Sequence, residues 1–355
     1  MRIGTITRRG LIGGTAALLA LPLARGPAAA ADMPALETES YRIPAADLGI
    51  ELYIRNKRPA GVTRFGPERI LLYVHGATYP SETAFDLKLD GLSMMDYIAA
   101  QGWDVYLVDV RGYGGSTRPP AMDQPAADNP PFATTEDAVR DVGAAVDHIL
   151  ARRHVARINL MGWSWGTSTM GMYTSRHNDK VARLVLYAPM WLFDAPPLIG
   201  GDQKLGAYRT VSKESARDRW LKGVPEDKKA ALIPPGWFEQ WADATWATDP
   251  DSAKTGLLRA PNGVVADVRA YWMAGKPQYD PADITVPTMI AHAEWDADLP
   301  SYQARAYFAK LTHAPYKRFV EFGEGTHTII MEKNRMQFFR EVMAFLNEAD
   351  PQALE

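Results

Sequence analysis

The chain has 355 residues, of which 46% are hydrophobic and 23% are charged, and its formal net charge at pH 7 is −3. This composition is typical of a globular protein, and the near-neutral charge argues against a nucleic-acid-binding surface or a basic membrane-binding face. The sequence has no cysteine, which excludes disulfides, a cysteine nucleophile and thiolate metal sites.

Residues 1–31 have the pattern of an export signal. Arg8 and Arg9 precede a mildly apolar run, and Ala29-Ala30-Ala31 would form a cleavage site. The run is too short for a membrane span and is interrupted by glycine and proline. Because the segment resembles a twin-arginine signal, we expect the twin-arginine export machinery as a transient partner. We also expect a periplasmic or secreted protein without a stable membrane anchor.

Strand and helix patterns alternate along most of the remaining chain. Strands are predicted at 41–45, 50–55, 69–74, 103–108, from 157 to the turn at 164, and at 181–187, 286–292 and 318–322. Helices are predicted at 92–101 and 134–153, after Gly166, and at 302–311 and 329–347. Continuous apolar strands that alternate with amphipathic helices predict a mainly parallel sheet with helices on both faces.

The alternation stops near Trp191 and resumes at Val286. The residues between them contain several tryptophans and prolines but no strong strand signal. We therefore interpret residues 191–285 as a mainly helical cap. This cap would be inserted between two strands of a core formed by residues 32–190 and 286–355.

A Gly-x-Ser-x-Gly pentapeptide lies at the junction of a predicted strand and a predicted helix, in Gly162-Trp163-Ser164-Trp165-Gly166. A tight turn from strand to helix needs residues without bulk, which the two glycines supply. The turn lifts the central hydroxyl out of the sheet, as in a nucleophile elbow. Ser164 is therefore the candidate nucleophile, and a glycine-rich turn with a surface serine is the alternative.

A serine nucleophile needs a base, and the base needs an acid to orient it. We assign the base to His327, which lies on a glycine-rich loop between the last strand and the C-terminal helix. Asp296 follows the strand that resumes the sheet, and the order serine, aspartate, histidine along the chain suits the role of the acid. The alternatives for the acid are Asp298, Glu294 and Asp194.

Two main-chain N–H groups are expected to stabilise the charge of a tetrahedral intermediate. Trp165, which follows the candidate nucleophile, would supply one. Ala77, in the loop after the strand that ends at Val74, would supply the other. His75 in that loop is expected to hold the loop by hydrogen bonds and not to join the triad.

These motifs resemble those of the α/β-hydrolase superfamily, in the same order and over almost all of the chain after the signal. They are Val74-His75-Gly76, residues 109–116, the pentapeptide at 162–166, Asp296 with Pro300, and Gly325-Thr326-His327. The resemblance implies an α/β-hydrolase fold, with a mostly parallel central sheet flanked by helices and an inserted cap. Haloalkane dehalogenases and epoxide hydrolases resemble this plan but use aspartate where this chain has Ser164.

The leading hypothesis is an exported serine esterase that cleaves small-molecule carboxylic esters through an acyl-enzyme intermediate. Trp163, Trp165, Trp191 and the tryptophans of the predicted cap would surround the substrate, which favours bulky apolar or aromatic esters. No metal or organic cofactor is implied.

Two other function classes stay open. The elbow at 164–167 is also similar to that of proline iminopeptidases, so an aminopeptidase or amidase on the same triad is an alternative. Residues 75–80 differ from the Gly-Gly-Pro-Gly loop of those enzymes, and Glu239 or Asp243 would have to bind the substrate amine. A non-catalytic binding protein on this scaffold is the third possibility.

Overall fold

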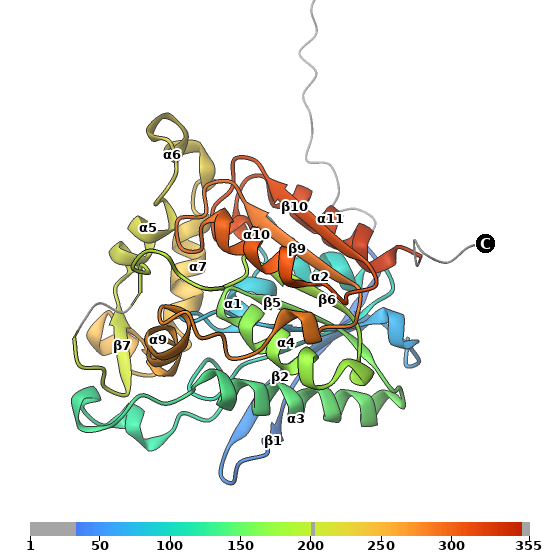
Figure 1. The fold of residues 1–355 in the computed structure, drawn as a ribbon, viewed down its shortest axis with the longest axis horizontal. Helices are drawn as coiled ribbons and strands as arrows, with labels where there is room; N and C mark the ends of the chain where they lie inside the picture. Colours follow the sequence, from blue (N-terminus) through green and yellow to red (C-terminus); the bar gives the residue numbers. More distant parts are fainter. Residues whose placement is uncertain (1–32, 200–202, 350–355) are drawn as a thin grey trace, which may run out of the picture. The chain divides into compact units, whose positions relative to one another are not determined.

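The computed structural model describes residues 33–199 and 203–349, which fold around a sheet of eight strands (Figure 1). The strand order is β1-β2-β4-β3-β5-β6-β9-β10. The strands are β1 (Leu36–Pro44), β2 (Glu51–Pro59), β3 (Ile70–Val74), β4 (Asp104–Val108), β5 (Ile158–Trp163), β6 (Val181–Tyr187), β9 (Thr288–Ala293) and β10 (Lys317–Phe322). All eight correspond to predicted strands.

Six neighbouring strands, from β4 to β10 in the sheet order, are parallel, whereas β2 is antiparallel to both β1 and β4. The carboxyl ends of the parallel strands therefore meet at one edge of the sheet. In an open parallel sheet, this is the edge at which ligands bind.

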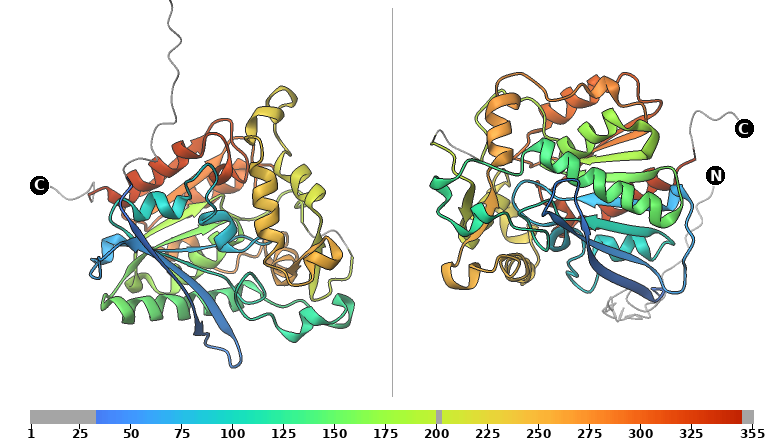
Figure 2. Two further views of the ribbon diagram at one scale, coloured as in Figure 1. Left: turned by 180° about the vertical axis from the view of Figure 1, so that it is seen from behind. Right: turned by 90° about the horizontal axis from the view of Figure 1, so that it is seen from below.

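Each face of the sheet carries its own hydrophobic cluster, because successive residues of a strand point to opposite faces. In β3, Leu72 and Val74 belong to one cluster, and Leu71 and Tyr73 belong to the other. The first face is covered by α3 (Thr135–Arg153), α4 (Trp165–Arg176) and α10 (Ser301–Lys310), and the second by α1 (Ser81–Phe85), α2 (Met94–Ala99) and α11 (Arg335–Asn347) (Figures 1 and 2). Burial from both sides explains the continuous apolar runs of the central strands.

Two differences from the predicted helices have local causes. The sequence pattern predicts no helix at α1, which has only five residues. The C-terminal helix was predicted from Ile329, but a 3-10 turn, η7 (Ile329–Met331), comes first and α11 begins at Arg335. Glu332 interrupts the helix because its backbone is extended, with φ −112° and ψ 171°, and its side chain accepts a hydrogen bond from the main-chain N–H of Thr326 at 3.0 Å.

The segment between β6 and β9 contains mostly helices. It comprises β7 (Tyr208–Val211), α5 (Lys213–Trp220), α6 (Glu226–Leu232), α7 (Trp237–Trp246), α8 (Ser252–Thr255), β8 (Leu258–Pro261), α9 (Gly263–Asp267), the π-helical turn η5 (Val268–Trp272) and the 3-10 turn η6 (Pro281–Asp283). The antiparallel pair β7–β8 was not predicted, since four residues are too few for a clear alternation. The division into core and cap stays an interpretation, because the described residues from Pro34 onward belong to one compact unit.

The remaining regular elements are short 3-10 turns: η1 (Pro67–Arg69), η2 (Pro120–Asp123), η3 (Ala126–Asp128) and η4 (Asn178–Lys180).

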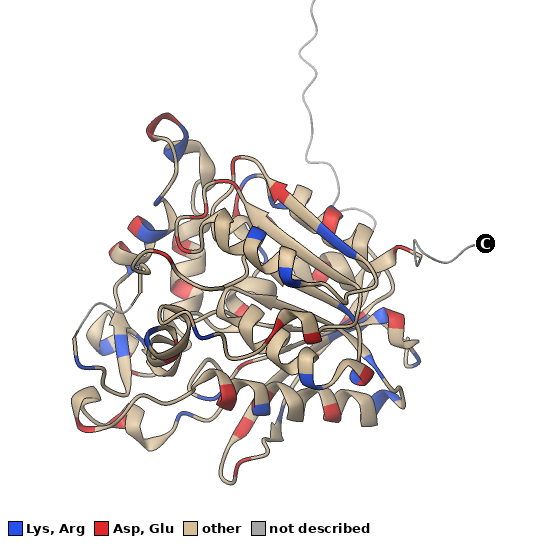
Figure 3. Ribbon diagram, in the orientation of Figure 1, with Lys and Arg blue, Asp and Glu red and all other residues tan. Residues whose placement is uncertain are grey.

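Charged residues of both signs are spread over helices, strands and loops (Figure 3). Some form ion pairs between elements, such as Arg153 on α3 with Asp104 on β4 at 2.6 Å.

The predicted export signal, residues 1–31, lies outside the described residues, so it stays a prediction. In the two described ranges, each helix lacks the combination of length and apolar character that crossing a bilayer requires.

Candidate active site

Ser164 lies between the end of β5 and the start of α4, in a backbone conformation that L residues rarely adopt. Its φ is 57° and its ψ is −123°, which costs on the order of 1–3 kcal/mol. The flanking glycines allow the turn, because a Cβ on Gly162 would lie 2.2 Å from the carbonyl oxygen of Gly166. A Cβ on Gly166 would lie 2.5 Å from the carbonyl oxygen of His75. The strained turn matches the geometry expected of a nucleophile elbow.

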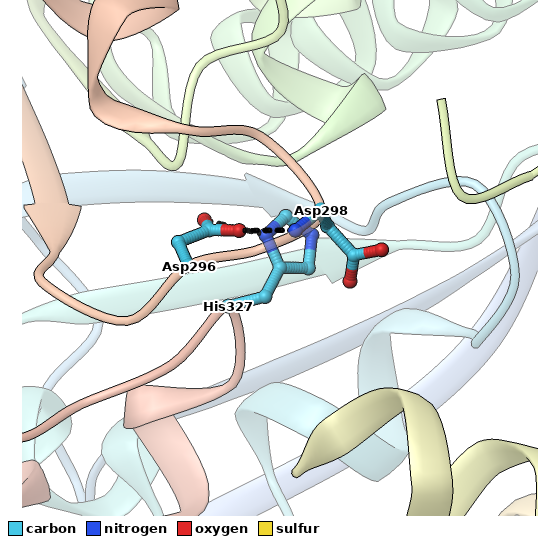
Figure 4. A group of neighbouring side chains, drawn as sticks. All are labelled: Asp296, Asp298 and His327. Atoms are coloured by element: carbon cyan, nitrogen blue, oxygen red, sulfur yellow. Dashed lines mark hydrogen bonds and ion pairs between the residues drawn. The ribbon is translucent and has the colours of Figure 1, made fainter. Parts of the chain in front are cut away.

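His327 and Asp296 are brought together by the loops that follow β10 and β9. Nδ1 of His327 lies 2.8 Å from Oδ2 of Asp296 (Figure 4). The other carboxylate oxygen of Asp296 accepts hydrogen bonds from the main-chain N–H groups of Asp298, at 3.0 Å, and Leu299, at 2.9 Å. A proton on Nδ1 leaves Nε2 of the imidazole as an acceptor, which is the tautomer that a general base needs.

The main chain of the histidine loop is held from the centre of the sheet. The carbonyl oxygen of His327 accepts hydrogen bonds from Nε1 of Trp163, at 2.9 Å, and from the hydroxyl of Tyr187, at 2.5 Å. Trp163 directly precedes Ser164 in the chain. One donor that fixes the histidine loop is therefore rigidly linked to the serine turn.

Two opposing effects set the pKa values of Asp296 and His327: burial disfavours the charged form of each group, and the attraction between the two groups favours it. Burial raises the pKa of Asp296, but the charge and hydrogen bond of His327 outweigh it, so the pKa lies below its ordinary value. Burial lowers the pKa of His327, but the negative charges of Asp296 and Asp298 outweigh it, so the pKa lies above its ordinary value. The arrangement therefore favours a carboxylate that stabilises a positive charge on the imidazole.

Asp298 is a second carboxylate beside the imidazole, at the ring edge opposite Asp296 (Figure 4). Its Oδ1 pairs with Nε of Arg219 on α5 at 2.7 Å. Asp296, Asp298 and His327 each offer a potential metal-ligating atom within 4.8 Å of the others. The hydrogen bond of His327 to Asp296 and the pairing of Asp298 with Arg219 already satisfy these groups, which suits a proton relay better than a cation site.

A narrow pocket lies over these residues, with a cavity volume of about 30 Å³, and we call it the Ser164 pocket. Its lining consists of Gly76, Ala77, Thr78, Tyr79, Trp163, Ser164, Ala216, Arg219, Trp220, Trp241, Asp298, His327 and Thr328. The candidate nucleophile and base therefore face the same space. Four of the lining residues are aromatic, and apart from the candidate catalytic residues the polar lining consists of the Arg219–Asp298 pair, Thr78 and Thr328.

The loop after β3 approaches the serine closely. A Cβ on Gly76 would lie 2.9 Å from Cβ of Ser164, which explains why glycine is needed there. His75 is buried and its Nε2 lies 3.1 Å from the main-chain N–H of Val110, while Nδ1 lies 2.7 Å from the carbonyl oxygen of Gly76. As predicted, its hydrogen bonds hold the loop. Ala77 lines the Ser164 pocket.

Not every predicted residue reaches the pocket with its side chain. The indole of Trp165 is buried and its Nε1 donates to the hydroxyl of Thr135 at 3.0 Å, so only its main chain lies at the turn. Trp191 does not line the Ser164 pocket, because its ring packs against Trp272, Tyr279 and Tyr307. The predicted contact of Trp191 with substrate therefore has no support in this geometry.

The alternative acids are also accounted for. The carboxylate of Glu294 accepts a hydrogen bond from the main-chain N–H of Glu324 at 2.9 Å. The main-chain N–H of Asp194 donates to the hydroxyl of Tyr302 at 3.2 Å. Of the four candidate acids, Asp296 is the one hydrogen-bonded to His327.

Sequence reasoning missed Tyr79 and Arg219 as pocket residues. Trp220 and Trp241 belong to the tryptophans that were expected near the substrate, although no signal singled them out. Arg219 lies on α5, and its contact with Asp298 depends on how that helix packs over the sheet edge. No local pattern reveals such a contact.

The sequence matches the family model described as the alpha/beta hydrolase fold over residues 70–334. No curated protein matches the sequence at a significant level. Among solved structures, a serine hydrolase from the polyaromatic hydrocarbon-degrading bacterium Cycloclasticus zankles is similar, with a TM-score of 0.58 and 16% identity over 88% of this chain and 98% of that chain.

Two further structures show the same likeness. One is a thermophilic esterase from Thermogutta terrifontis, with a TM-score of 0.55 and 18% identity over 87% of this chain and 100% of that chain. The other is a meta-cleavage product hydrolase from Pseudomonas fluorescens, with a TM-score of 0.57 and 16% identity over 86% of this chain and 97% of that chain. At such identities, the similarity concerns the fold.

Proposed function

Because the chain belongs to the α/β-hydrolase family and is a hydrolase of that fold, we propose that it cleaves carboxylic esters through an acyl-enzyme intermediate on Ser164. The observation that carries the proposal is the 2.8 Å contact between His327 and Asp296 in loops that open onto the same pocket as Ser164. A hydroxyl on a strained turn, an imidazole whose Nδ1 faces a carboxylate and the buried carboxylate itself are the parts that acyl transfer needs.

In the proposed first half-reaction, the hydroxyl of Ser164 attacks the ester carbonyl carbon as Nε2 of His327 takes its proton. Asp296 stabilises the imidazolium that forms. The tetrahedral intermediate then collapses, the carbon–oxygen bond to the alcohol breaks, and His327 returns the proton to the leaving oxygen. In the second half-reaction, His327 removes a proton from water as the water oxygen attacks the acyl carbon. The bond between that carbon and Oγ of Ser164 then breaks, His327 returns the proton to Oγ, and the acid leaves.

Negative charge develops on the carbonyl oxygen in both half-reactions. We assign its stabilisation to the main-chain N–H groups of Trp165 and Ala77, one at the start of α4 and one in the loop after β3. The N-terminal end of α4 adds the positive end of a helix dipole at the same place.

The composition of the pocket walls supports substrates with an apolar or aromatic group, and the walls would have to move apart to admit a bulky one, because the cavity volume is about 30 Å³. Tyr79, Trp163, Trp220 and Trp241 all line the Ser164 pocket. Aromatic walls offer a large apolar contact area and gain little from short, polar acyl chains. We therefore propose aromatic or branched esters in preference to acetyl esters of small alcohols.

An aminopeptidase or amidase on the same residues is the second candidate, but the proposed amine-binding groups lie elsewhere. Glu239 pairs with Arg217 at 3.1 Å, and Asp243 pairs with Lys213 at 2.5 Å. Both carboxylates are well exposed and neither lines the Ser164 pocket. The carboxylate that does line the pocket, Asp298, is paired with Arg219.

Export through a twin-arginine signal remains part of the proposal. Replacement of both Arg8 and Arg9 by lysine should retain the protein in the cytoplasm of a host with this export pathway, whereas the unchanged chain should reach the periplasm. Equal distribution of the two forms between the fractions would contradict the proposed route.

The proposed reaction is tested with a panel of p-nitrophenyl and naphthyl esters, a lactone and the p-nitroanilides of proline and alanine. We expect ester cleavage by the unchanged chain, with the larger apolar esters preferred, and a loss of at least a thousandfold, roughly, in Ser164→Ala. Faster release of p-nitroaniline than of p-nitrophenol would favour the aminopeptidase. Full ester turnover by Ser164→Ala would exclude the proposed mechanism, and binding without turnover would favour the non-catalytic alternative.

A further inference from the structure

A guanidinium from the segment between β6 and β9 is bound to the loop that follows β3. Arg209 on β7 donates from Nη2 to the carbonyl oxygen of Ala77, at 2.6 Å, and to the hydroxyl of Thr78, at 2.9 Å. Its Nη1 donates to the carbonyl oxygen of Pro261 on β8, also at 2.6 Å. One side chain therefore connects the β7–β8 pair to the loop that lies over Ser164.

The surroundings of Arg209 are unusual for a cation. Its acceptors, which also include the carbonyl oxygen of Ala260 at 3.5 Å, are all neutral, and among the described residues no carboxylate forms an ion pair with it. Burial lowers the pKa of Arg209, and the positive charge of Arg219 also acts to lower it. Arg209 is half-buried, and a charge that is partly removed from water without a counter-ion is costly. By contrast, Arg259 on β8 is paired with Asp249 at 2.5 Å.

The peptide that Arg209 holds is also held from the sheet side. The hydroxyl of Tyr113, in the loop after β4, donates to the same carbonyl oxygen of Ala77 at 2.7 Å. Two donors from different parts of the chain thus fix this carbonyl. Because Gly76 lies directly against Ser164, a small rotation of the loop would move the N–H of Ala77 relative to the serine.

We propose that Arg209 is a positioning residue that aims the N–H of Ala77 at the developing oxyanion. The inserted segment would then take part in transition-state stabilisation as well as covering the site. This inference rests on the proposed function, because it requires Ser164 to form a tetrahedral intermediate. The positive charge of Arg209 would also favour negative charge on the nearby oxygen.

The test compares Arg209→Met, Arg209→Lys and Arg259→Met with the unchanged full chain. For each we would measure kcat and KM for p-nitrophenyl butyrate, the inhibition constant of a trifluoromethyl ketone that mimics the tetrahedral intermediate, and the unfolding temperature. We expect Arg209→Met to lower kcat and the affinity for the ketone in parallel, each by about tenfold or more. KM should change by less than about threefold.

The other variants distinguish the effect of the positive charge of Arg209 from the effects of its donor geometry and of folding. Arg209→Lys keeps the charge but loses the forked donor, so we expect an intermediate loss. Arg259→Met should lower the unfolding temperature, because it removes the ion pair with Asp249. It should leave the ratio of the ketone's inhibition constant to KM unchanged, because Arg259 does not bind the loop after β3. If Arg209→Met does not fold, Tyr113→Phe removes the other donor to Ala77 and should show the same parallel loss on a smaller scale.

The proposal is overturned if Arg209→Met, or Tyr113→Phe where the former does not fold, keeps the kcat and the ketone affinity of the unchanged chain. It is also overturned if Arg259→Met shows the same parallel loss, since the effect would then belong to folding of the segment. Failure of the proposed function is recognised separately, because the unchanged chain would not cleave the ester or would do so without Ser164.

Discussion

The indole N–H of Trp220 donates to Oε1 of Glu332 over 2.9 Å and so connects α5 to the turn that follows the histidine loop. Glu332 is fully buried, and its other oxygen accepts a hydrogen bond from the main-chain N–H of Thr326 at 3.0 Å. The hydroxyl of Thr326 also donates to Glu332. A single carboxyl group therefore supports a wall of the Ser164 pocket and the residue next to His327.

Because of the Glu332 carboxyl group, the free energy of unfolding should decrease as the pH rises, which is the opposite of the usual effect of a carboxylate. Burial raises the pKa of Glu332 from 4.5 to about 7. The folded protein therefore holds this proton more tightly than the unfolded chain does, and the associated stability is lost as the pH rises from about 4.5 through about 7. The Glu332→Gln variant has no carboxyl group at this position to titrate. Over this range, its unfolding free energy should therefore decline by about 2 kcal/mol less than that of the unchanged chain.

Denaturant unfolding of Glu332→Gln at a series of pH values measures this difference. Glu324→Gln is the matched control, because Lys228 and Lys333 lower the pKa of the exposed Glu324 to about 2 and its titration lies below this range. Identical pH slopes for the unchanged chain and Glu332→Gln would show that the buried carboxyl does not titrate between these pH values.

The two carboxylates beside His327 should differ greatly in their effect on the rate. Asp296 accepts the hydrogen bond of Nδ1, so Asp296→Asn should favour the wrong tautomer and lower kcat by roughly a thousandfold to ten-thousandfold. Asp298→Asn leaves that hydrogen bond intact and should lower kcat by less than about tenfold. Steady-state kinetics on one ester compares them, and a larger loss in Asp298→Asn would reassign the acid.

The Arg219–Asp298 pair should instead affect the pH profile. The negative charge of Asp298 contributes to raising the pKa of His327, and the positive charge of Arg219 opposes it. The base must be neutral to act, so the acidic limb of kcat/KM follows this pKa. We expect Arg219→Met to shift that limb to higher pH and Asp298→Asn to shift it to lower pH, each by about half a pH unit to one unit.

The double variant Arg219→Met/Asp298→Asn provides the control for that prediction. Because both charges are removed, its acidic limb should lie between those of the single variants. Shifts of both single variants in the same direction would indicate a change in the structure of the pocket and not an electrostatic effect on His327.

The size of the Ser164 pocket should respond to Trp241 and not to Trp191. Trp241 lines the pocket, and its buried Nε1 has no hydrogen-bond partner among the described residues. Trp241→Phe therefore removes volume without breaking a hydrogen bond. We expect the ratio of kcat/KM for naphthyl esters to that for acetyl esters to rise by about threefold or more.

Trp191→Phe is the matched control for this change of selectivity. Trp191 is equally buried but packs against Trp272, Tyr279 and Tyr307, outside the pocket lining. It should lower stability by roughly 1–2 kcal/mol and leave the ratio of the two esters unchanged. A selectivity change in Trp191→Phe as large as that in Trp241→Phe would contradict the assignment of the pocket wall.

The sequence predicted what depends on local pattern and chain order. Ser164, Asp296 and His327 each follow a strand of the parallel sheet, so their approach follows from topology once the strands are recognised. The strand pair β7–β8 escaped prediction because each strand has only four residues. The contacts of Arg209 and Arg219 were not predictable, since they depend on how the inserted segment packs.

Trp191 shows the limit of composition as a guide. A tryptophan-rich segment next to a predicted site suggests aromatic pocket walls, but tryptophan side chains pack equally well in a hydrophobic core. Trp220 and Trp241 line the pocket, while Trp272 packs with Trp191 in the hydrophobic cluster on the face covered by α3 and α4. Only the three-dimensional path of the chain distinguishes these positions.

The most direct measurement of the central claim is covalent labelling by a fluorophosphonate, with the modified residue identified by mass spectrometry. We predict labelling of Ser164 in the unchanged chain, labelling slowed by about a hundredfold or more in His327→Ala, and none in Ser164→Ala. Labelling at another residue, or at an equal rate without the imidazole, would contradict a serine nucleophile activated by His327.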